Sequence, residues 1–335
     1  MELLWNGLSL MGGLSLFLFG MHLMGQGLEK RAGERLKDFL SRLTSSRFRG
    51  LLLGIAVTAL IQSSSAVTVM AVGFVNSGLM TLSQVTGIVM GANIGTTVTA
   101  WLISLTQLEG ESFFLRLLKP ATFTPILAFV GILFYLFSKR ETRQITGSIF
   151  LGFAVLIFGM DTMSAAVKPL SNLPAFGEVF LWFQNPLLGV LVGTLLTAIL
   201  QSSSASIGIL QALSSAGQIT VGAAIPIIMG QNIGTCVTTL ISSVGANRNA
   251  KRTAMIHLYF NLIGTGVLLG AFSLLRATLR LPFVNDTVTA FQIALIHTLF
   301  NLLCTVLLFP LVPWLEQLAV RTVPEKKTAG EGLEL

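Results

Sequence analysis

A polar stretch that occurs twice constrains this chain more than any other feature. The letters QSSSA stand at 62–66 and return unchanged at 201–205, an offset of 139 residues, each time inside an apolar segment. The same offset superimposes GANIGTTVT at 91–99 on GQNIGTCVT at 230–238. One ungapped offset that serves several landmarks indicates an internal duplication, so the two halves are expected to fold alike.

Composition places the duplicated chain in a membrane. Of its 335 residues 53% are hydrophobic and only 10% are charged, whereas a soluble domain carries about 25% charged residues. The first apolar run, 6–28, lacks a basic start and has spanning length, so it is interpreted as a span and not as a cleavable signal. The net charge of +7 fits basic loops on the inner side of a membrane, and no aromatic-interleaved basic face indicates nucleic-acid binding.

The two QSSSA stretches are expected at the turns of helical hairpins, 50–76 and 188–215. Each apolar arm is about a dozen residues long, whereas a helix needs ~20 residues to cross ~30 Å of hydrocarbon. Each pair of arms is therefore expected to enter the membrane, turn at the polar core and leave on the same side. Such a re-entrant hairpin is tolerated only where protein or a water-filled cavity covers the turn.

The crossing after each hairpin is expected to be a broken helix, because two glycines flank a polar Asn at 91–95 and again at 230–234. Amphipathic helices on the membrane surface are expected at 33–46 and 171–186, and the chain after Pro313 is expected to be a polar tail. The broken crossings are 81–106 and 218–243, and the unbroken ones are 6–28, 119–138, 145–168, 253–275 and 289–315.

Three crossings per half, an odd number, would invert the second half relative to the first. If 29–49 lies inside, the inner segments carry 16 of the 21 Lys and Arg residues, which follows the positive-inside rule and puts the N-terminus outside and the C-terminus in the cytoplasm. We expect an all-α integral protein of the plasma membrane, with two inverted-topology repeats that each contain a re-entrant helical hairpin and a broken transmembrane helix. Its divisions are 1–143 and 144–276 (the repeats), 277–318 (an extra transmembrane helix) and 319–335 (a polar cytoplasmic tail).

Paired hairpins in inverted repeats are typical of secondary transporters, whose site lies near mid-membrane at the repeat interface. The helix that starts at each tip presents free N–H groups to an anion, and the helix that ends there leaves carbonyls that suit Na⁺. The anion ligands expected are Gln62, Ser63, Ser64, Ser65, Gln201, Ser202, Ser203 and Ser204. The sodium ligands expected are Gln62, Ser65, Asn93, Thr96, Gln201, Ser204, Asn232 and Thr235.

Sodium also has an electrostatic reason to be present. The expected site has no obligatory Lys or Arg, so an anion in low dielectric would be costly without bound cations. The anion site would then be weak until the sodium sites fill, and the reverse would hold by linkage. Cys236 and Cys304 lie in apolar segments and are interpreted as small hydrophobic residues, so no transition-metal site is expected.

Other interpretations of the same residues are open to test. Serine clusters in membrane helices often serve close packing, which suits a single triplet better than a duplicated one. An intramembrane serine hydrolase would need a general base, and no His or Lys stands near either cluster in sequence, so an enzyme is not expected. His22 and Asp161 occupy equivalent positions within spans and are expected to have structural or interfacial roles.

At 62–65 with 91–96, and again at 201–204 with 223–235, the sequence resembles the type II sodium–phosphate cotransporter family. The resemblance covers roughly 6–310. It implies sodium-driven import of inorganic phosphate, with both QSSS tips contributing to the phosphate and sodium sites and no organic cofactor. It also implies elevator-like or rocking alternation, often in a homodimer. Vertebrate members carry a long disulfide-bonded loop between the halves, and because this chain has no comparable insertion it looks like a bacterial member.

Two rival functions remain beside this expectation. A sodium-coupled dicarboxylate carrier would also use paired hairpins, and competition by succinate but not by arsenate would favour it. A membrane anchor or sensor for a phosphate-signalling partner would bind its ligand without flux.

Overall fold

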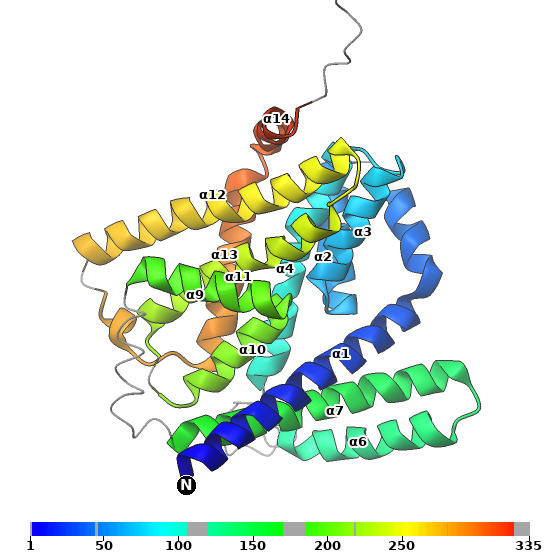
Figure 1. Ribbon diagram of the computed structural model, residues 1–335, viewed down its shortest axis with the longest axis vertical. Helices are drawn as coiled ribbons and strands as arrows, with labels where there is room; N and C mark the ends of the chain where they lie inside the picture. Colours follow the sequence, from blue (N-terminus) through cyan, green and yellow to red (C-terminus); the bar gives the residue numbers. More distant parts are fainter. Residues whose placement is uncertain are drawn as a thin grey trace, which may run out of the picture.

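The computed structural model describes residues 2–43, 46–105, 120–169, 185–217, 219–279 and 281–324, and nearly all of them are helical (Figure 1). The described residues form twelve α-helices and one short 3₁₀ helix. In chain order these are α1 Glu2–Leu43, α2 Arg47–Ile61, α3 Ser64–Asn76, α4 Leu82–Ser104, α6 Pro120–Phe137, α7 Glu141–Val167, α9 Pro186–Leu200, α10 Ser203–Ser214, α11 Val221–Ser242, α12 Arg248–Thr278, η3 Pro282–Asn285, α13 Ala290–Leu308 and α14 Val312–Thr322.

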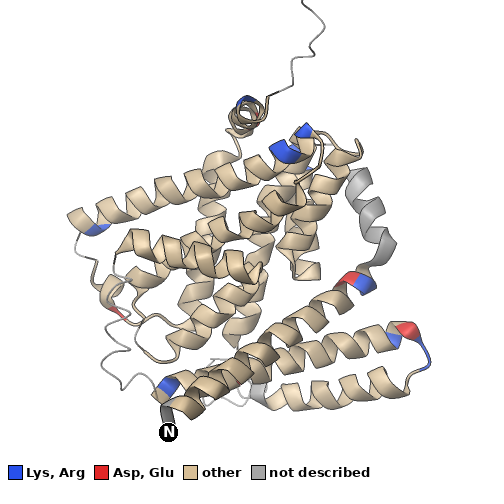
Figure 2. Cartoon of the chain, viewed as in Figure 1, with Lys and Arg blue, Asp and Glu red and all other residues tan. Residues whose placement is uncertain are grey.

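Six of these helices are long and apolar enough to cross a membrane. Among the described residues, most charged side chains lie at or near helix ends and connections (Figure 2), with one cluster inside α1 at Glu29, Lys30 and Arg31. Together these features describe a multi-pass membrane protein. The six candidate spans are Leu4–Ala32, Leu82–Ser104, Glu141–Val167, Val221–Ser242, Arg248–Thr278 and Ala290–Leu308.

Helices α1 and α7 lie side by side, with α6 packed on α7 (Figure 1). Their backbones touch at glycines: a Cβ on Gly20 would lie 2.6 Å from the Gly152 carbonyl oxygen, and a Cβ on Gly159 would lie 2.7 Å from the Gly13 oxygen. As residue numbers rise along α1, the numbers of the contacting residues in α7 fall, so the two helices run antiparallel. No side chain larger than hydrogen fits at these crossing points, which explains the glycines.

A second glycine contact recurs at both copies of the duplicated sequence. In the α2–α4 pair a Cβ on Gly54 would lie 2.3 Å from the Ile88 oxygen, and in the α9–α11 pair a Cβ on Gly193 would lie 2.1 Å from the Ile227 oxygen. Both residues of the first contact lie 139 positions before their counterparts in the second. The repeated sequence therefore makes the same helix–helix contact twice.

The expectation that the crossings 81–106 and 218–243 are broken helices is wrong. Helices α4 and α11 run without interruption through both glycine pairs. The glycines serve backbone approach instead: a Cβ on Gly91 would lie 2.1 Å from the Leu51 oxygen, and one on Gly230 would lie 2.0 Å from the Val190 oxygen. A glycine that lets a neighbouring helix approach closely gives the same sequence pattern as a glycine that breaks a helix.

The expected surface helix 33–46 and the expected polar tail also differ from the structure. Residues 33–43 continue α1 instead of forming a separate surface helix, and most of the expected connector 171–186 lies outside the described residues. The tail expected after Pro313 is instead largely the amphipathic helix α14. Its residues Val312, Leu315 and Ala319 share one helix face and are buried. An ion pair of 3.7 Å between Arg47 and Glu316 fastens this helix to α2.

Candidate functional site

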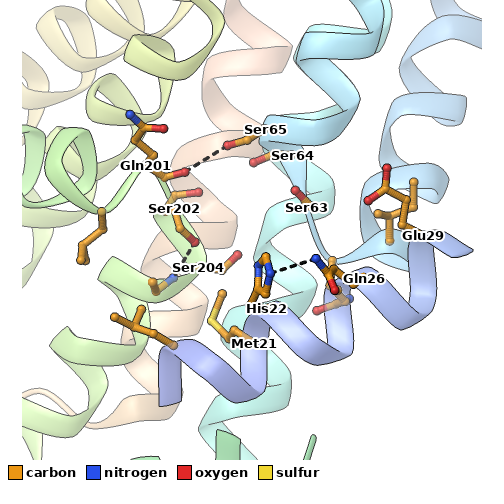
Figure 3. A pocket seen from close by; sticks show the side chains of 17 residues that line it. Met21, His22, Gln26, Glu29, Ser63, Ser64, Ser65, Gln201, Ser202 and Ser204 are labelled. Carbon is orange, nitrogen blue, oxygen red and sulfur yellow. Dashed lines mark hydrogen bonds between the residues drawn. The ribbon is translucent and has the colours of Figure 1, made fainter. Parts of the chain in front are cut away.

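A cavity of about 530 Å³ lies where the two QSSS tips meet helix α1 (Figure 3). The α2–α3 turn supplies one wall, the α9–α10 turn supplies another, and α1 supplies a third. All eight residues expected as anion ligands line this one cavity. The lining residues are Leu18, Met21, His22, Gly25, Gln26, Glu29, Ile61, Gln62, Ser63, Ser64, Ser65, Leu200, Gln201, Ser202, Ser203, Ser204 and Ala205.

The two tips have the same backbone conformation. Gln62 (φ 61°) and Gln201 (φ 53°) end their helices in the left-handed region, and they are the described non-glycine residues with positive φ. Ser63 and Ser202 follow in extended conformation and cap the next helices, each accepting from a backbone N–H at 3.2 Å. Left-handed non-glycine residues are costly and concentrate at functional sites.

The tips also contact each other. The Ser65 hydroxyl donates to the carbonyl oxygen of Gln201 at 3.4 Å (Figure 3). The expected convergence of two stretches that lie 139 positions apart is therefore present in the fold. That these residues bind phosphate stays a prediction.

The cavity wall is rich in hydrogen-bond donors. Ser64, Ser203 and Ser204 are 7%, 4% and 6% exposed, and within the described part of the chain none of their hydroxyls makes a hydrogen bond to protein. Helices α3 and α10 begin here, so their first-turn N–H groups and positive dipole ends face the cavity. No Lys or Arg is among the lining residues. Donors without fixed positive charge suit an oxyanion that brings its own cations.

The structure does not bring the other sodium candidates to this cavity. Asn93, Thr96, Asn232 and Thr235 are buried in α4 and α11, and none of them lines it. Each donates to a carbonyl of its own helix four residues back, at 2.8–3.0 Å. Their role as sodium ligands stays a prediction, separate from the anion cavity.

The two glutamines differ in what holds their side chains. Thr99 Oγ1 donates to Gln62 Oε1 at 2.8 Å, and Gln62 Nε2 donates to the carbonyl oxygen of Ala59. Gln201 is exposed, and the buried hydroxyl of Thr238, the counterpart of Thr99, has no partner within the described residues. Identical letters at the two tips are therefore held asymmetrically.

Sequence reasoning missed the wall that α1 provides. His22, Gln26 and Glu29 line the cavity, and Gln26 Nε2 lies 2.9 Å from His22 Nε2. The sequence could have indicated this wall, because the three polar residues stand at positions i, i+4 and i+7 and therefore share one helix face. His22 is paired with Gln26 and not with a serine, so the cavity holds no nucleophile–base pair among its described residues.

The described residues also hold no cluster of three or more His, Cys, Asp and Glu side chains that would suit a transition metal. The described residues form a multi-span helical membrane protein with a cavity that two helix-capped serine turns and α1 line. That combination is typical of membrane transporters.

The particular family follows from comparison. The chain belongs to the Na⁺/Pi-cotransporter family, whose model matches residues 16–165 and 178–299. Members of this family are transporters and not enzymes; they use Na⁺ as coupling ion and no organic cofactor.

Relatives of known sequence agree with this assignment. YqeW of Bacillus subtilis, a protein of uncharacterised function, is 30% identical over 92% of this chain and 96% of its own length. YjbB of Escherichia coli, named as a candidate inorganic phosphate export protein, is 28% identical over 91% of this chain, which spans about half (53%) of YjbB. The human sodium-dependent phosphate transport protein 2B is 36% identical over 39% of this chain and 22% of its own length. No solved structure matches the chain.

Proposed function

We propose that this protein moves inorganic phosphate across the plasma membrane together with Na⁺, and that it imports phosphate when sodium flows inward. One observation carries the proposal: two helix starts, with buried serines whose hydroxyls have no hydrogen-bond partner within the described residues, converge on one cavity with no lysine or arginine among its described lining residues. Membership in the Na⁺/Pi-cotransporter family supplies the identity of the ions.

The geometry supports a division of labour at each tip. Ser64 and Ser203 begin helices, where hydroxyls and free N–H groups favour an oxyanion. Gln62 and Gln201 end helices, where the last carbonyls lack partners within their helix and favour Na⁺. Because phosphate carries more charge than helix dipoles can neutralise, sodium binding strengthens phosphate binding, and the coupling is reciprocal.

We further propose that the halves 1–143 and 144–276 are inverted repeats whose short hairpins re-enter the membrane. The antiparallel α1–α7 contact supports inversion, because these helices occupy equivalent positions in the two halves. Arms of 15, 13, 15 and 12 residues support re-entry, since each falls short of the ~20 residues that a crossing needs. An outer N-terminus, a cytoplasmic C-terminus, elevator-like alternation and a homodimer complete the proposal.

Direction needs its own test, because the name of the relative YjbB refers to export. A symporter moves its solute either way, following the combined gradients. Import therefore requires that phosphate accumulates against its gradient when sodium is higher outside. Efflux driven only by internal phosphate and indifferent to sodium would favour the export function instead.

The decisive experiment uses the full chain in proteoliposomes. Radiolabelled phosphate should accumulate when an inward Na⁺ gradient is imposed, and it should not accumulate with K⁺ in place of Na⁺. Arsenate should compete, whereas succinate should not; the opposite pattern would favour a dicarboxylate carrier. Phosphate binding without flux in either direction would favour an anchor or sensor and would overturn transport.

A further inference from the structure

Helix α1 presents a short polar stripe to the cavity. His22 and Gln26 point from α1 toward the space between the two tips (Figure 3), and Glu29 follows one turn further along. His22 is exposed to this space. The stripe faces buried serines whose hydroxyls have no protein partner within the described residues, so the cavity has a histidine on the wall opposite the two tips.

The titratable groups around His22 are few. Among the lining residues the other one is Glu29, seven positions along α1 and hence about 10 Å away along the helix axis. The two tips bring only Gln, Ser and apolar residues. The stretch of α7 that packs on this part of α1, 148–156, is apolar except for Ser148. Lys30 and Arg31 follow on α1 and do not line the cavity.

We propose that His22 is a direct ligand of the transported anion, and that its protonated imidazole supplies positive charge which the two serine tips cannot. This inference rests on the proposed function, since it concerns the same cavity. Histidine is the side chain whose charge ordinarily changes between about pH 5 and 8, and a charged donor binds an oxyanion more tightly than a neutral one. Phosphate affinity thus gains a component that follows the charge of His22.

Gln26 suits this arrangement in both charge states. Its amide carries a donor and an acceptor, so it can donate to a bare ring nitrogen or accept from a protonated one. The contact of 2.9 Å to Nε2 therefore survives protonation by rotation of the amide. The ring stays oriented, and the other ring nitrogen is available to the anion.

The first test is phosphate binding to the purified chain with saturating Na⁺, measured by equilibrium dialysis. His22→Gln keeps a hydrogen-bonding side chain but cannot carry charge. We expect the variant to bind phosphate about tenfold more weakly than the wild type near pH 6, and to match it near pH 8. Comparing the two proteins at each pH cancels the titration of phosphate itself. Equal weakening at both pH values, or no weakening at either, would overturn the proposal.

The second test uses the wild-type chain alone and so does not depend on how a variant folds. The sequence contains three histidines, and His257 and His297 are each only 1% exposed. Diethylpyrocarbonate should therefore modify mainly His22, which peptide mass spectrometry can locate. Saturating phosphate with Na⁺ should reduce this modification several-fold. Undiminished modification in protein that demonstrably binds phosphate would refute contact.

The outcomes separate the two ideas. Wild-type protein that binds no phosphate at either pH would defeat the proposed function, and with it this inference. Wild-type protein that binds phosphate, while His22→Gln behaves identically, would defeat the role of His22 alone. Unfolding midpoints of the two proteins should agree, because His22 faces open space.

Discussion

Gly20 of α1 packs against Gly152 of α7, and the reciprocal pair Gly13 and Gly159 packs in the same way. Gly152 and Gly159 lie 139 positions after Gly13 and Gly20, so each helix meets its own duplicate through the same residues. Reciprocal contacts of this kind are those of a two-fold symmetric interface, here formed within one chain. At the α1–α7 contact, equivalent helices of the two duplicated halves thus pack through equivalent residues.

This contact predicts a sharp difference between two glycines of the same helix. A Cβ on Gly20 would lie 2.2 Å from the Leu156 nitrogen, whereas a Cβ on Gly12 would meet nothing within 4 Å. Gly20→Ala should therefore destabilise the protein by about 1–3 kcal/mol or more. Gly12→Ala should be neutral or slightly stabilising, because alanine favours helix. Thermal unfolding in detergent measures both, and equal midpoints would contradict the close approach.

The serine hydroxyls predict the chemistry of the cavity. Ser64→Ala and Ser203→Ala each remove one buried donor, so each should weaken phosphate binding by about 1.5–3 kcal/mol, roughly ten- to a hundredfold. Ser77→Ala is the matched control, because Ser77 is an exposed residue at the far end of α3. Phosphate uptake into proteoliposomes measures all three. Uptake that falls equally in the control would count against a specific site.

The asymmetry of the glutamines predicts unequal effects at equivalent threonines. Thr99→Val removes the 2.8 Å hydrogen bond to Gln62 and should lower stability by about 1 kcal/mol. Thr238→Val removes a buried hydroxyl that has no partner within the described residues, so it should be neutral or stabilising. Each variant controls for the other in an unfolding series. Similar losses in both would show that Thr238 has found a partner.

The left-handed backbone at Gln201 predicts a trade between stability and function. Glycine adopts the left-handed conformation without side-chain strain, and relief of that strain stabilises the folded state by about 1–2 kcal/mol. The greater conformational entropy of glycine in the unfolded state offsets part of this gain. Gln201→Gly should thus be at least as stable as the wild type and yet transport phosphate more slowly. A variant that is both less stable and fully active would disprove this account.

The α14 helix predicts a pH effect away from the cavity. Burial raises the pKa of Glu316 above its ordinary value, although Arg47 and a hydrogen bond from Ser83 oppose the shift. The folded state therefore favours the protonated carboxyl, so stability is full below the unfolded pKa and is lost as pH rises through the folded pKa. Glu316→Gln, which mimics the protonated form, should be more stable near pH 7, and the gain should vanish once the carboxyl is protonated in both the folded and the unfolded state. Unfolding midpoints across pH test this, and a variant less stable at neutral pH would refute it.

Much of the site was predictable from two copies of one motif. Because the apolar arms beside each QSSS stretch are too short to span a membrane, hairpins at 50–76 and 188–215 were expected, and inversion then predicted that their tips converge. The predicted helix break near Asn93 is wrong because a glycine flanked by apolar residues permits either a bend or the close approach of a second helix. Which of the two occurs depends on the helix that packs there, and the sequence alone does not show it. That His22 lines the cavity could not be predicted for a similar reason, since it depends on which elements lie across from α1.

The unequal glutamines could not be predicted at all, because the letters around them are the same. Two identical turns that line one cavity need not hold their side chains alike: Gln62 accepts a hydrogen bond from Thr99, whereas the hydroxyl of Thr238, the counterpart of Thr99, has no partner within the described residues. The duplication therefore gives two equivalent Gln–Thr pairs, of which the first is hydrogen-bonded. If Thr238 held Gln201 while Thr99 released Gln62, the cavity would take a two-fold-related arrangement that uses only residues present in both copies.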